Sequence, residues 1–276
     1  MYVRAQGVPV SPEWLLLREP ADAAARSAEL AERLGRHLSG AATLVIHDLG
    51  GGSGAMGRWL APRLPGPQHW VVHDRDVGLL DLAVAGAPGP AADGAAVTVE
   101  ARRSDIIRLA PRDLAGASLI VASAVLDMLT ADGLAGMLGA WTGIGCCPML
   151  LALTVVGRVA LTPADPLDAR LAAAFNAHQR RTTTAGPLLG PDAVAAAVGE
   201  LRGTGAELVV RSSPWRLDAA HADLTAEWFG AWAAAACEQE RALATEARAY
   251  RDRRLAQAAA GQLAVTVDHA DLLVLP

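Results

Sequence analysis

The chain has 276 residues, of which 52% are hydrophobic, 19% are charged and only 4% are aromatic. This composition excludes disorder and indicates a large core filled chiefly by Ala, Leu and Val, as one domain with an appendage. A net charge of −5 argues against a nucleic-acid partner, because phosphate binding needs clustered excess cations. All 24 basic side chains are arginine, which excludes a lysine Schiff base and a lysine-dependent phosphate loop.

Cysteine usage and the N-terminal residues indicate a reducing, cytoplasmic location. Of the three cysteines, Cys146 and Cys147 are adjacent, so we expect neither a disulfide between them nor a metal site. No apolar stretch of signal-peptide length precedes the first charged residues. The uncharged stretch 133–157 is long enough to span a bilayer, but its glycines and Pro148 favour a helix followed by a buried strand. We therefore expect no membrane partner.

Residues 1–41 are predicted to form an N-terminal helical cover. An alanine-rich helix is expected over 21–38, with Leu30, Leu34 and Leu38 on one stripe. The apolar run 14–17 ahead of it must cover something, either the mouth of a site or a partner subunit in a homodimer. Trp14 is therefore a candidate substrate-binding residue.

Strands and helices alternate from residue 42, which predicts parallel βαβ units. Strands are expected at 42–47, 69–73, 96–101, 117–123 and 148–156, with helices at 54–64, 76–85 and 131–141. Further helices at about 166–181 and 191–202 lead to a strand at 206–212 and an alanine-rich helical stretch, and the chain closes with β-rich residues 263–275. We predict one α/β domain over 42–276, with a helical insertion at about 222–260 before the last strand.

An acidic, glycine-rich turn follows the first predicted strand. Asp48 is followed by Gly50, Gly52 and Gly54, and glycine lets a backbone approach a ligand closely because it has no Cβ. The second strand ends in Asp74, where an open parallel sheet places an acid against ribose hydroxyls. Residues 52–57 also match the dinucleotide fingerprint G-x-G-x-x-G, so an NAD-dependent oxidoreductase remains an alternative.

These segments resemble the cofactor-binding motifs of class I S-adenosylmethionine-dependent methyltransferases. The resemblance covers roughly residues 42–160. It implies a Rossmann-like, mostly parallel seven-stranded sheet with one antiparallel strand, helices on both faces, and S-adenosyl-L-methionine as the cofactor. A non-catalytic binding subunit that retains this fold is a further alternative.

The resemblance also implies roles for particular residues. The glycine turn would pack against the methionine part of the cofactor, Asp74 would accept hydrogen bonds from the ribose, and Arg75 would lie beside the adenine. The segment Ser104, Asp105 and Ile106 would recognise the adenine amino group through an acid and a backbone N–H. Ser123 and Ala124, which end the fourth strand, would lie under the sulfonium.

The acceptor is expected to be a small molecule, bound partly by helices over about 165–204. If the acceptor is a hydroxyl, a base must take its proton, and His178 and Asp127 are the candidates. Phe175 and Gln179 lie four residues apart and share a helix face. The remaining candidates for acceptor contacts are Met128 and Asn176. Arg18 and Arg26 are near enough in sequence to reach the cofactor carboxylate, whereas His47 and His73 are predicted to be core histidines.

Overall fold

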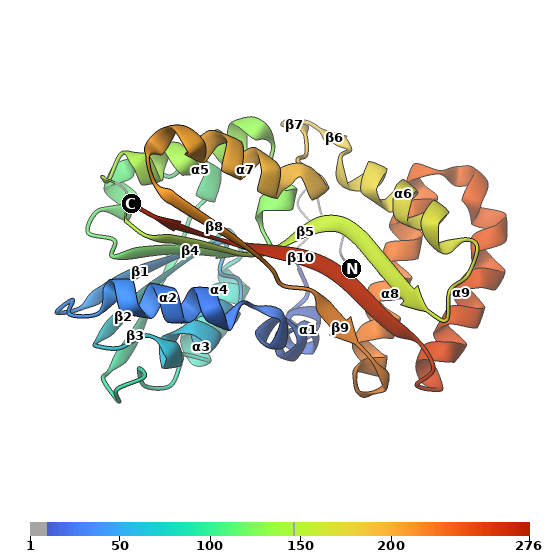
Figure 1. The fold of residues 1–276 in the computed structure, drawn as a ribbon, viewed down its shortest axis with the longest axis horizontal. Coiled ribbons are helices and arrows are strands. Elements are labelled where there is room, and N and C mark those ends of the chain that lie inside the picture. The colour runs from blue at the N-terminus through green and yellow to red at the C-terminus, as the bar shows by residue number, and fades with distance from the viewer. Residues whose placement is uncertain (1–9, 146) are drawn as a thin grey trace.

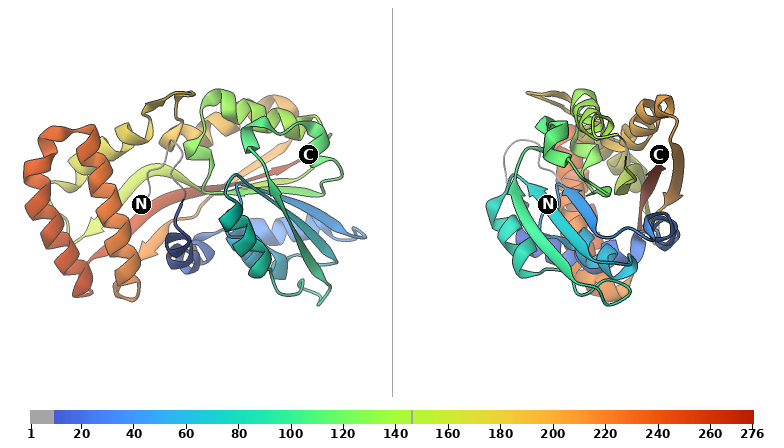
Figure 2. Two further views of the ribbon diagram at one scale, coloured as in Figure 1. Left: turned by 180° about the vertical axis from the view of Figure 1, so that it is seen from behind. Right: turned by 90° about the vertical axis from the view of Figure 1, so that its left-hand side faces the viewer.

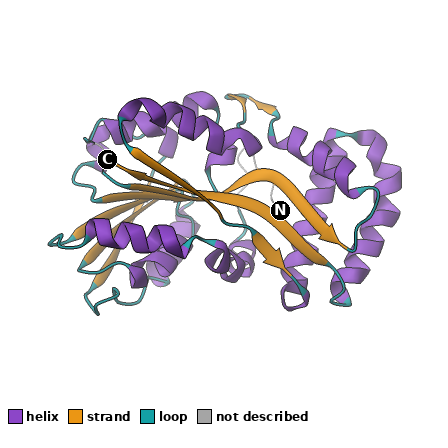
Figure 3. Cartoon of the chain, viewed as in Figure 1, coloured by secondary structure: helices purple, strands orange, loops and turns teal. Residues whose placement is uncertain are grey.

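In the computed structural model, which describes residues 10–145 and 147–276, a central sheet is covered by helices on both faces (Figures 1 and 3). The strands run in the order β3-β2-β1-β4-β5-β10-β8, and β9 also pairs with β10. Their bounds are β1 Leu44–Leu49, β2 Gln68–Asp74, β3 Val97–Arg103, β4 Leu119–Ser123, β5 Met149–Thr162, β8 Glu207–Ser212, β9 Trp215–Leu217 and β10 Ala264–Leu275.

The sheet has the predicted class of topology. The pairs β1–β2, β1–β4, β2–β3 and β4–β5 are parallel, whereas β10 is antiparallel to β5, β8 and β9. This confirms the Rossmann-like, mostly parallel sheet with one reversed strand. The short strand β9 makes the sheet eight-stranded rather than seven-stranded.

Helices of different parts of the chain cover the two faces (Figure 2). One face carries α2 (Ala28–Leu38), α3 (Ala55–Leu60) and α4 (Val77–Ala85), and the other carries α5 (Ala131–Thr142) and α7 (Ala193–Leu201). Leu30 and Leu34 of α2 are fully buried, and together with Leu38 they pack against a core that includes Leu44 and Trp70. Burying this apolar stripe is what fixes α2 to the sheet.

The single helix expected over 21–38 is two helices. The first, α1, spans Pro12–Ala25, and the backbone turns at Arg26 before α2 begins. The hydroxyl of Ser27 accepts a hydrogen bond from the Leu30 N–H, so Ser27 is the N-cap that starts a new helix. As a result α2 packs on the sheet, whereas α1 runs in a different direction and packs in another core with Trp14 and Ala21.

Strands β5 and β10 continue past the parallel sheet as a long antiparallel ribbon (Figure 1). This ribbon, with β9 and α1, supports a second core in which α6 (Asp168–Gln179), α8 (Ala222–Gln239) and α9 (Ala244–Ala259) pack together. Trp228, Phe229 and Trp232 form its aromatic centre. The predicted helical insertion is α8 and α9, and we call α6, α8 and α9 the helical lobe.

The buried carboxylate of Asp271 connects several segments that are far apart in the sequence. Its carboxylate accepts hydrogen bonds from the Leu153 N–H, the Ser213 hydroxyl and the Ser27 N–H. Leu153 has a φ of 54°, a left-handed conformation that bends β5 there. One buried carboxylate therefore joins β5, β10 and the junction between α1 and α2.

The uncharged stretch 133–157 divides between α5 and β5, as its sequence predicts. In the part of the chain that the structure describes, no helix combines the length and apolarity needed to cross a bilayer.

Candidate functional site

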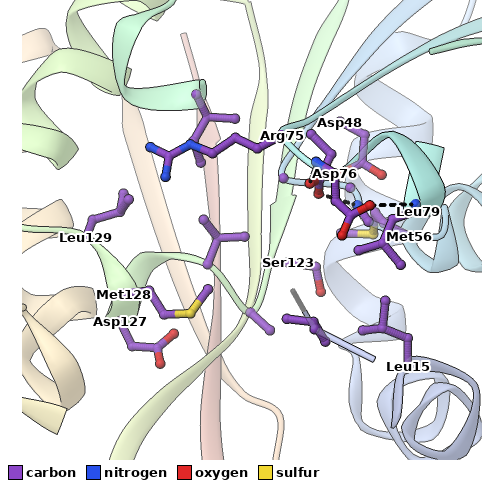
Figure 4. A pocket seen from close by; sticks show the side chains of 18 of the residues that line it. Leu15, Asp48, Met56, Arg75, Asp76, Leu79, Ser123, Asp127, Met128 and Leu129 are labelled. Atoms are coloured by element: carbon purple, nitrogen blue, oxygen red, sulfur yellow. Dashed lines mark hydrogen bonds between the residues drawn. The ribbon is translucent and has the colours of Figure 1, made fainter. Parts of the chain in front are cut away.

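A cavity of about 870 Å³ lies at the carboxyl ends of the parallel strands, between the sheet and α1. Figure 4 shows Asp48, Met56 and Leu79 on one side of it and Asp127 and Met128 on the other, with Ser123 between them. The predicted site residues that line this cavity are Trp14, Asp48, Gly50, Gly52, Asp74, Arg75, Ser104, Ile106, Ser123, Ala124, Asp127 and Met128. Gly54, Asp105 and the candidates on α6 do not line it.

The glycine turn is held by the residues that end β2. The His73 carbonyl accepts hydrogen bonds from the N–H groups of Gly50 (2.8 Å) and Gly51 (3.1 Å). The Asp74 carboxylate accepts one from Gly52 at 3.0 Å. A Cβ on Gly51 would lie 2.6 Å from the Asp48 carboxyl, so the turn needs glycine for close packing around that acid.

Three polar side chains that line the cavity have buried atoms with no hydrogen-bond partner among the described residues. The atoms without a partner are both carboxyl oxygens of Asp48, Nε and Nη1 of Arg26, and the hydroxyl oxygen of Ser53. Burial raises the pKa of Asp48 to about 7, although the positive charge of Arg26 opposes that rise. Burial also lowers the pKa of Arg26. Unpaired buried charges are costly, so their presence beside one cavity indicates a polar ligand.

Arg26 also connects the cavity to the end of β4. Its Nη2 donates to the Ser123 hydroxyl at 3.1 Å, and its guanidinium lies 5.6 Å from the centre of the Trp59 ring. The next residue, Ala124, has a φ of 56°, which L-residues other than Asn and Asp rarely adopt. Backbone strain of this kind is often found at functional sites, and here it lies in the wall of the cavity.

Helix α1 supplies one whole wall. Trp14, Arg18, Asp22 and Arg26 follow each other at intervals of four residues and all line the cavity, as Leu15 does. Of these, Arg18 pairs with Asp22 at 2.9 Å, and its guanidinium lies 5.0 Å from the Trp215 ring. The apolar run 14–17 thus lies partly in the cavity wall, and its only exposed large side chain is Leu16.

At one end of the cavity Asp74, Ser104, Ile106 and Arg75 lie close together. The Ser104 N–H donates to the Asp74 carbonyl at 2.9 Å, which joins the ends of β2 and β3. Asp105 takes no part in this wall. Its carboxylate pairs with Arg75 at 2.5 Å and caps the following 3-10 turn by accepting from the Ile107 N–H.

At the other end, Asp127 lies on a 3-10 turn, Leu126–Met128, directly after β4. Its carboxyl is half-buried, and no described side chain forms a hydrogen bond with it. Burial raises the pKa of Asp127 to about 6, and Arg18 and Arg181 only partly oppose that effect. Apolar side chains make up much of the cavity wall around Asp127, and they belong to Met128, Leu129, Leu153, Val155 and Leu188.

The other candidates for acceptor contacts lie inside the helical lobe. Phe175 packs 6.3 Å from the Trp232 ring, and the Asn176 amide donates to the Gly157 carbonyl at 2.7 Å. His178 is buried, with Nδ1 3.9 Å from the Glu238 carboxylate, and burial lowers its pKa. Gln179 is buried as well. The structure therefore does not bring these α6 residues to the cavity.

Sequence reasoning missed other parts of the wall. Thr183, Thr184 and Ala185 reach the cavity from a hairpin whose strands are Thr182–Thr183 and Gly186–Pro187. Two-residue strands leave no periodic signal, so nothing local marks them. Asp22, in contrast, could have been found, because it continues the four-residue spacing from Trp14 through Arg18 to Arg26.

No family model matches the chain, and no curated protein matches it in sequence. Solved structures do match. A cyclopropane synthase from Mycobacterium tuberculosis is 13% identical, with a TM-score of 0.52 over 97% of this chain and 95% of that one. The chain therefore shares the Rossmann-like fold of this solved structure.

Two further structures are similar over most of the chain. An S-adenosylmethionine-dependent methyltransferase from Thiobacillus denitrificans, crystallised with S-adenosyl-L-homocysteine, is 15% identical, with a TM-score of 0.44 over 98% of this chain and 100% of that one. A magnesium protoporphyrin IX methyltransferase from Synechocystis, also with S-adenosyl-L-homocysteine bound, is 15% identical, with a TM-score of 0.44 over 78% of this chain and 84% of that one.

Proposed function

We propose that this protein transfers a methyl group from S-adenosyl-L-methionine to a small-molecule acceptor. The observation that carries the proposal is the pair of buried, opposite and unpaired charges, Asp48 and Arg26, beside the glycine turn. A ligand that carries both an ammonium and a carboxylate on one carbon satisfies both groups. The amino-acid end of S-adenosyl-L-methionine is such a ligand.

The remaining contacts of that cofactor have counterparts along the same cavity. Asp74, at the end of β2, is an acceptor of the kind that ribose hydroxyls bind. Ile106 and Ile107 offer apolar surface to a flat base, and Ser104 adds a hydroxyl. The cofactor supplies an electrophilic methyl group on a positively charged sulfur.

A dinucleotide fits these groups less well. The arginine that follows the glycine turn in sequence, Arg58, is already bound to the Glu19 carboxylate by two contacts of 2.6 Å and to the Ser53 carbonyl. It is therefore not free to neutralise a pyrophosphate. A pyrophosphate would also bring further negative charge towards Asp48 and Asp74, whereas a zwitterion and a sulfonium would not.

The acceptor end supports a small molecule with an apolar body and one O–H or N–H group. Asp127 is an ionisable group there that forms no hydrogen bond with a described side chain, and Met128, Leu129 and Val155 form apolar wall around it. Asp127 can hold the acceptor by that O–H or N–H and take its proton as the new bond to carbon forms. Orientation and exclusion of water by the apolar wall supply the rest.

Calorimetry with S-adenosyl-L-homocysteine tests the cofactor. We expect a Kd in the micromolar range, about −8 kcal/mol, and no heat with NAD. Binding of NAD without binding of S-adenosyl-L-homocysteine would instead support an oxidoreductase. Incubation with a metabolite extract and a donor labelled on the methyl group then tests turnover, and absence of any labelled product from a cofactor-binding protein would support a non-catalytic subunit.

A further inference from the structure

Two buried histidines hold the hydroxyl of Ser104 from inside the sheet. His47 Nδ1 lies 2.9 Å from His73 Nε2, and His73 Nδ1 lies 2.9 Å from Ser104 Oγ. The two rings are inclined by 22° with centres 5.1 Å apart. Burial lowers the pKa of both histidines to about 4, so each ring carries one proton at neutral pH. The core histidines expected from the sequence therefore form a hydrogen-bonded chain that ends at Ser104, a residue that lines the main cavity.

This chain determines what Ser104 presents to a ligand. If His73 carries its proton on Nε2, then Nδ1 accepts the hydroxyl proton of Ser104. If the proton is on Nδ1, His73 donates to Oγ, and the Arg102 carbonyl, 3.4 Å away, is the acceptor for the hydroxyl proton. In both arrangements the proton of Ser104 has a partner inside the protein. Oγ keeps a lone pair, so Ser104, which is a residue of the cavity wall, can accept a hydrogen bond from an N–H group.

The neighbouring acid is engaged by other groups. One oxygen of Asp105 accepts from Arg75 at 2.5 Å and from the Ile107 N–H at 3.3 Å, and the other lies 3.6 Å from Arg108. Asp105 lines a smaller neighbouring pocket together with His73 and Ser104, and of these three residues only Ser104 also lines the main cavity. The role that the sequence resemblance gives to the acid at this position is therefore open to the hydroxyl beside it.

We propose that Ser104, positioned by His73, accepts the hydrogen bond of the 6-amino group of the cofactor's base, in place of Asp105. This inference rests on the proposed function. It makes Ser104 a specificity-determining residue, because a base with a carbonyl at position 6 would bring one acceptor against another. His73 is a positioning residue, and it also holds the glycine turn through its carbonyl.

Paired calorimetry with S-adenosylhomocysteine and its 6-oxo counterpart, S-inosylhomocysteine, tests the inference. The wild-type protein should bind the amino form at least about tenfold more tightly, since one hydrogen bond is lost and an acceptor is left facing an acceptor. Ser104→Ala should reduce the preference below about threefold, and the matched variant Asp105→Asn should keep the wild-type preference. If the wild-type protein binds neither compound, the proposed function fails; if it binds both equally, only this inference fails.

Replacing His73 by asparagine and by glutamine distinguishes a positioning role of this residue from a purely structural one. His73→Asn keeps a polar atom near Nδ1, which faces Ser104, whereas His73→Gln keeps one near Nε2, which faces His47. We expect the asparagine variant to retain the preference and the glutamine variant to lose it, with thermal melting confirming that both fold. Equal preferences in the two variants would overturn the positioning role. A preference that survives Ser104→Ala and disappears in Asp105→Asn would assign the amino group to the acid.

Discussion

Arg26 and Asp48 reach the same cavity from the end of α1 and from β1, and each influences the pKa of the other without forming an ion pair. Among the described residues, the Arg26 side chain forms a hydrogen bond only with Ser123, and the Asp48 carboxyl forms none. Two opposite charges that were kept only for stability would pair directly, because an unpaired buried charge is costly. Their separation is what a zwitterionic ligand between them requires.

Replacing Arg26 tests one half of this arrangement. Arg26→Met keeps much of the side-chain volume over Trp59 but removes the charge, so binding of S-adenosylhomocysteine should weaken by about 1.5–3 kcal/mol. Titration calorimetry measures the loss. The matched control is Arg63→Met, because Arg63 also lies over the Trp59 ring, at 4.8 Å, yet does not line the cavity. Similar losses in the two variants would mean that packing on Trp59, and not charge, is responsible.

Asp48 should make binding of the proposed cofactor depend on pH. Its pKa of about 7 in the free protein means that the carboxyl is largely protonated below pH 7, whereas the ligand's ammonium requires the carboxylate. Affinity should therefore rise with pH, by up to tenfold per unit below about pH 7, and level off above it. Calorimetry in buffers with different heats of ionisation should detect proton release on binding near pH 6.5.

Asp48→Asn should remove this pH dependence, and Asp127→Asn should leave it in place because Asp127 lies at the other end of the cavity. The stability of the free protein depends on pH in the opposite direction to the affinity. A pKa raised in the folded state stabilises the free protein below the unfolded value of 3.8, and this contribution is lost as pH rises to about 7. A flat affinity profile in the wild-type protein would show that Asp48 does not meet the ligand's ammonium.

The sequence predicts many of the residues that line the cavity around the glycine turn, because that wall is made of consecutive local elements. An apolar strand, an acid and spaced glycines are visible within the thirteen residues 42–54, and the rule that ligands bind at the carboxyl ends of parallel strands brings Asp74 and Ser104 to them. The left-handed conformations of Gly50 and Gly52 agree with this prediction.

The acceptor end is less predictable because its geometry is set at long range. The spacing of Phe175 and Gln179 indicates one helix face, but a face that packs on a partner helix has the same spacing as one that lines a pocket. Strand β5 extends to Thr162 rather than to residue 156, and α6 follows it into the helical lobe. Only this tertiary arrangement separates His178 from the cavity and leaves Asp127 in it.

Asp74 should contribute both to ligand binding and to the conformation of the glycine turn. Its carboxylate already accepts the N–H groups of Gly52 and Asp76, so Asp74→Ala removes support from the glycine turn in addition to a ribose acceptor. We expect the binding free energy of S-adenosylhomocysteine to weaken by about 1.5–3 kcal/mol or more, with the fold retained. The exposed Asp81 on α4 provides the control Asp81→Ala. A folded Asp74→Ala variant with wild-type affinity would show that Asp74 is only a turn residue.

Asp127 should control turnover rather than cofactor binding. As the base for the acceptor's proton it must be ionised, so kcat/KM should rise through a pH of about 6 and reach a plateau near neutrality, in line with its raised pKa. Asp127→Asn keeps the shape and loses the base, and the rate should fall by about 10²–10⁴. The Kd of S-adenosylhomocysteine should change little, because the carboxyl lies away from Asp48 and Asp74.

The control for Asp127 is His178→Gln. His178 is buried within the helical lobe and does not line the cavity, so its replacement should leave the pH profile of the rate unchanged. Rates are measured with labelled methyl donor once an acceptor is in hand, at saturating cofactor so that differences in binding do not enter. If His178→Gln removes the limb near pH 6 and Asp127→Asn does not, then the proton goes to the histidine, and the lobe must open to expose it.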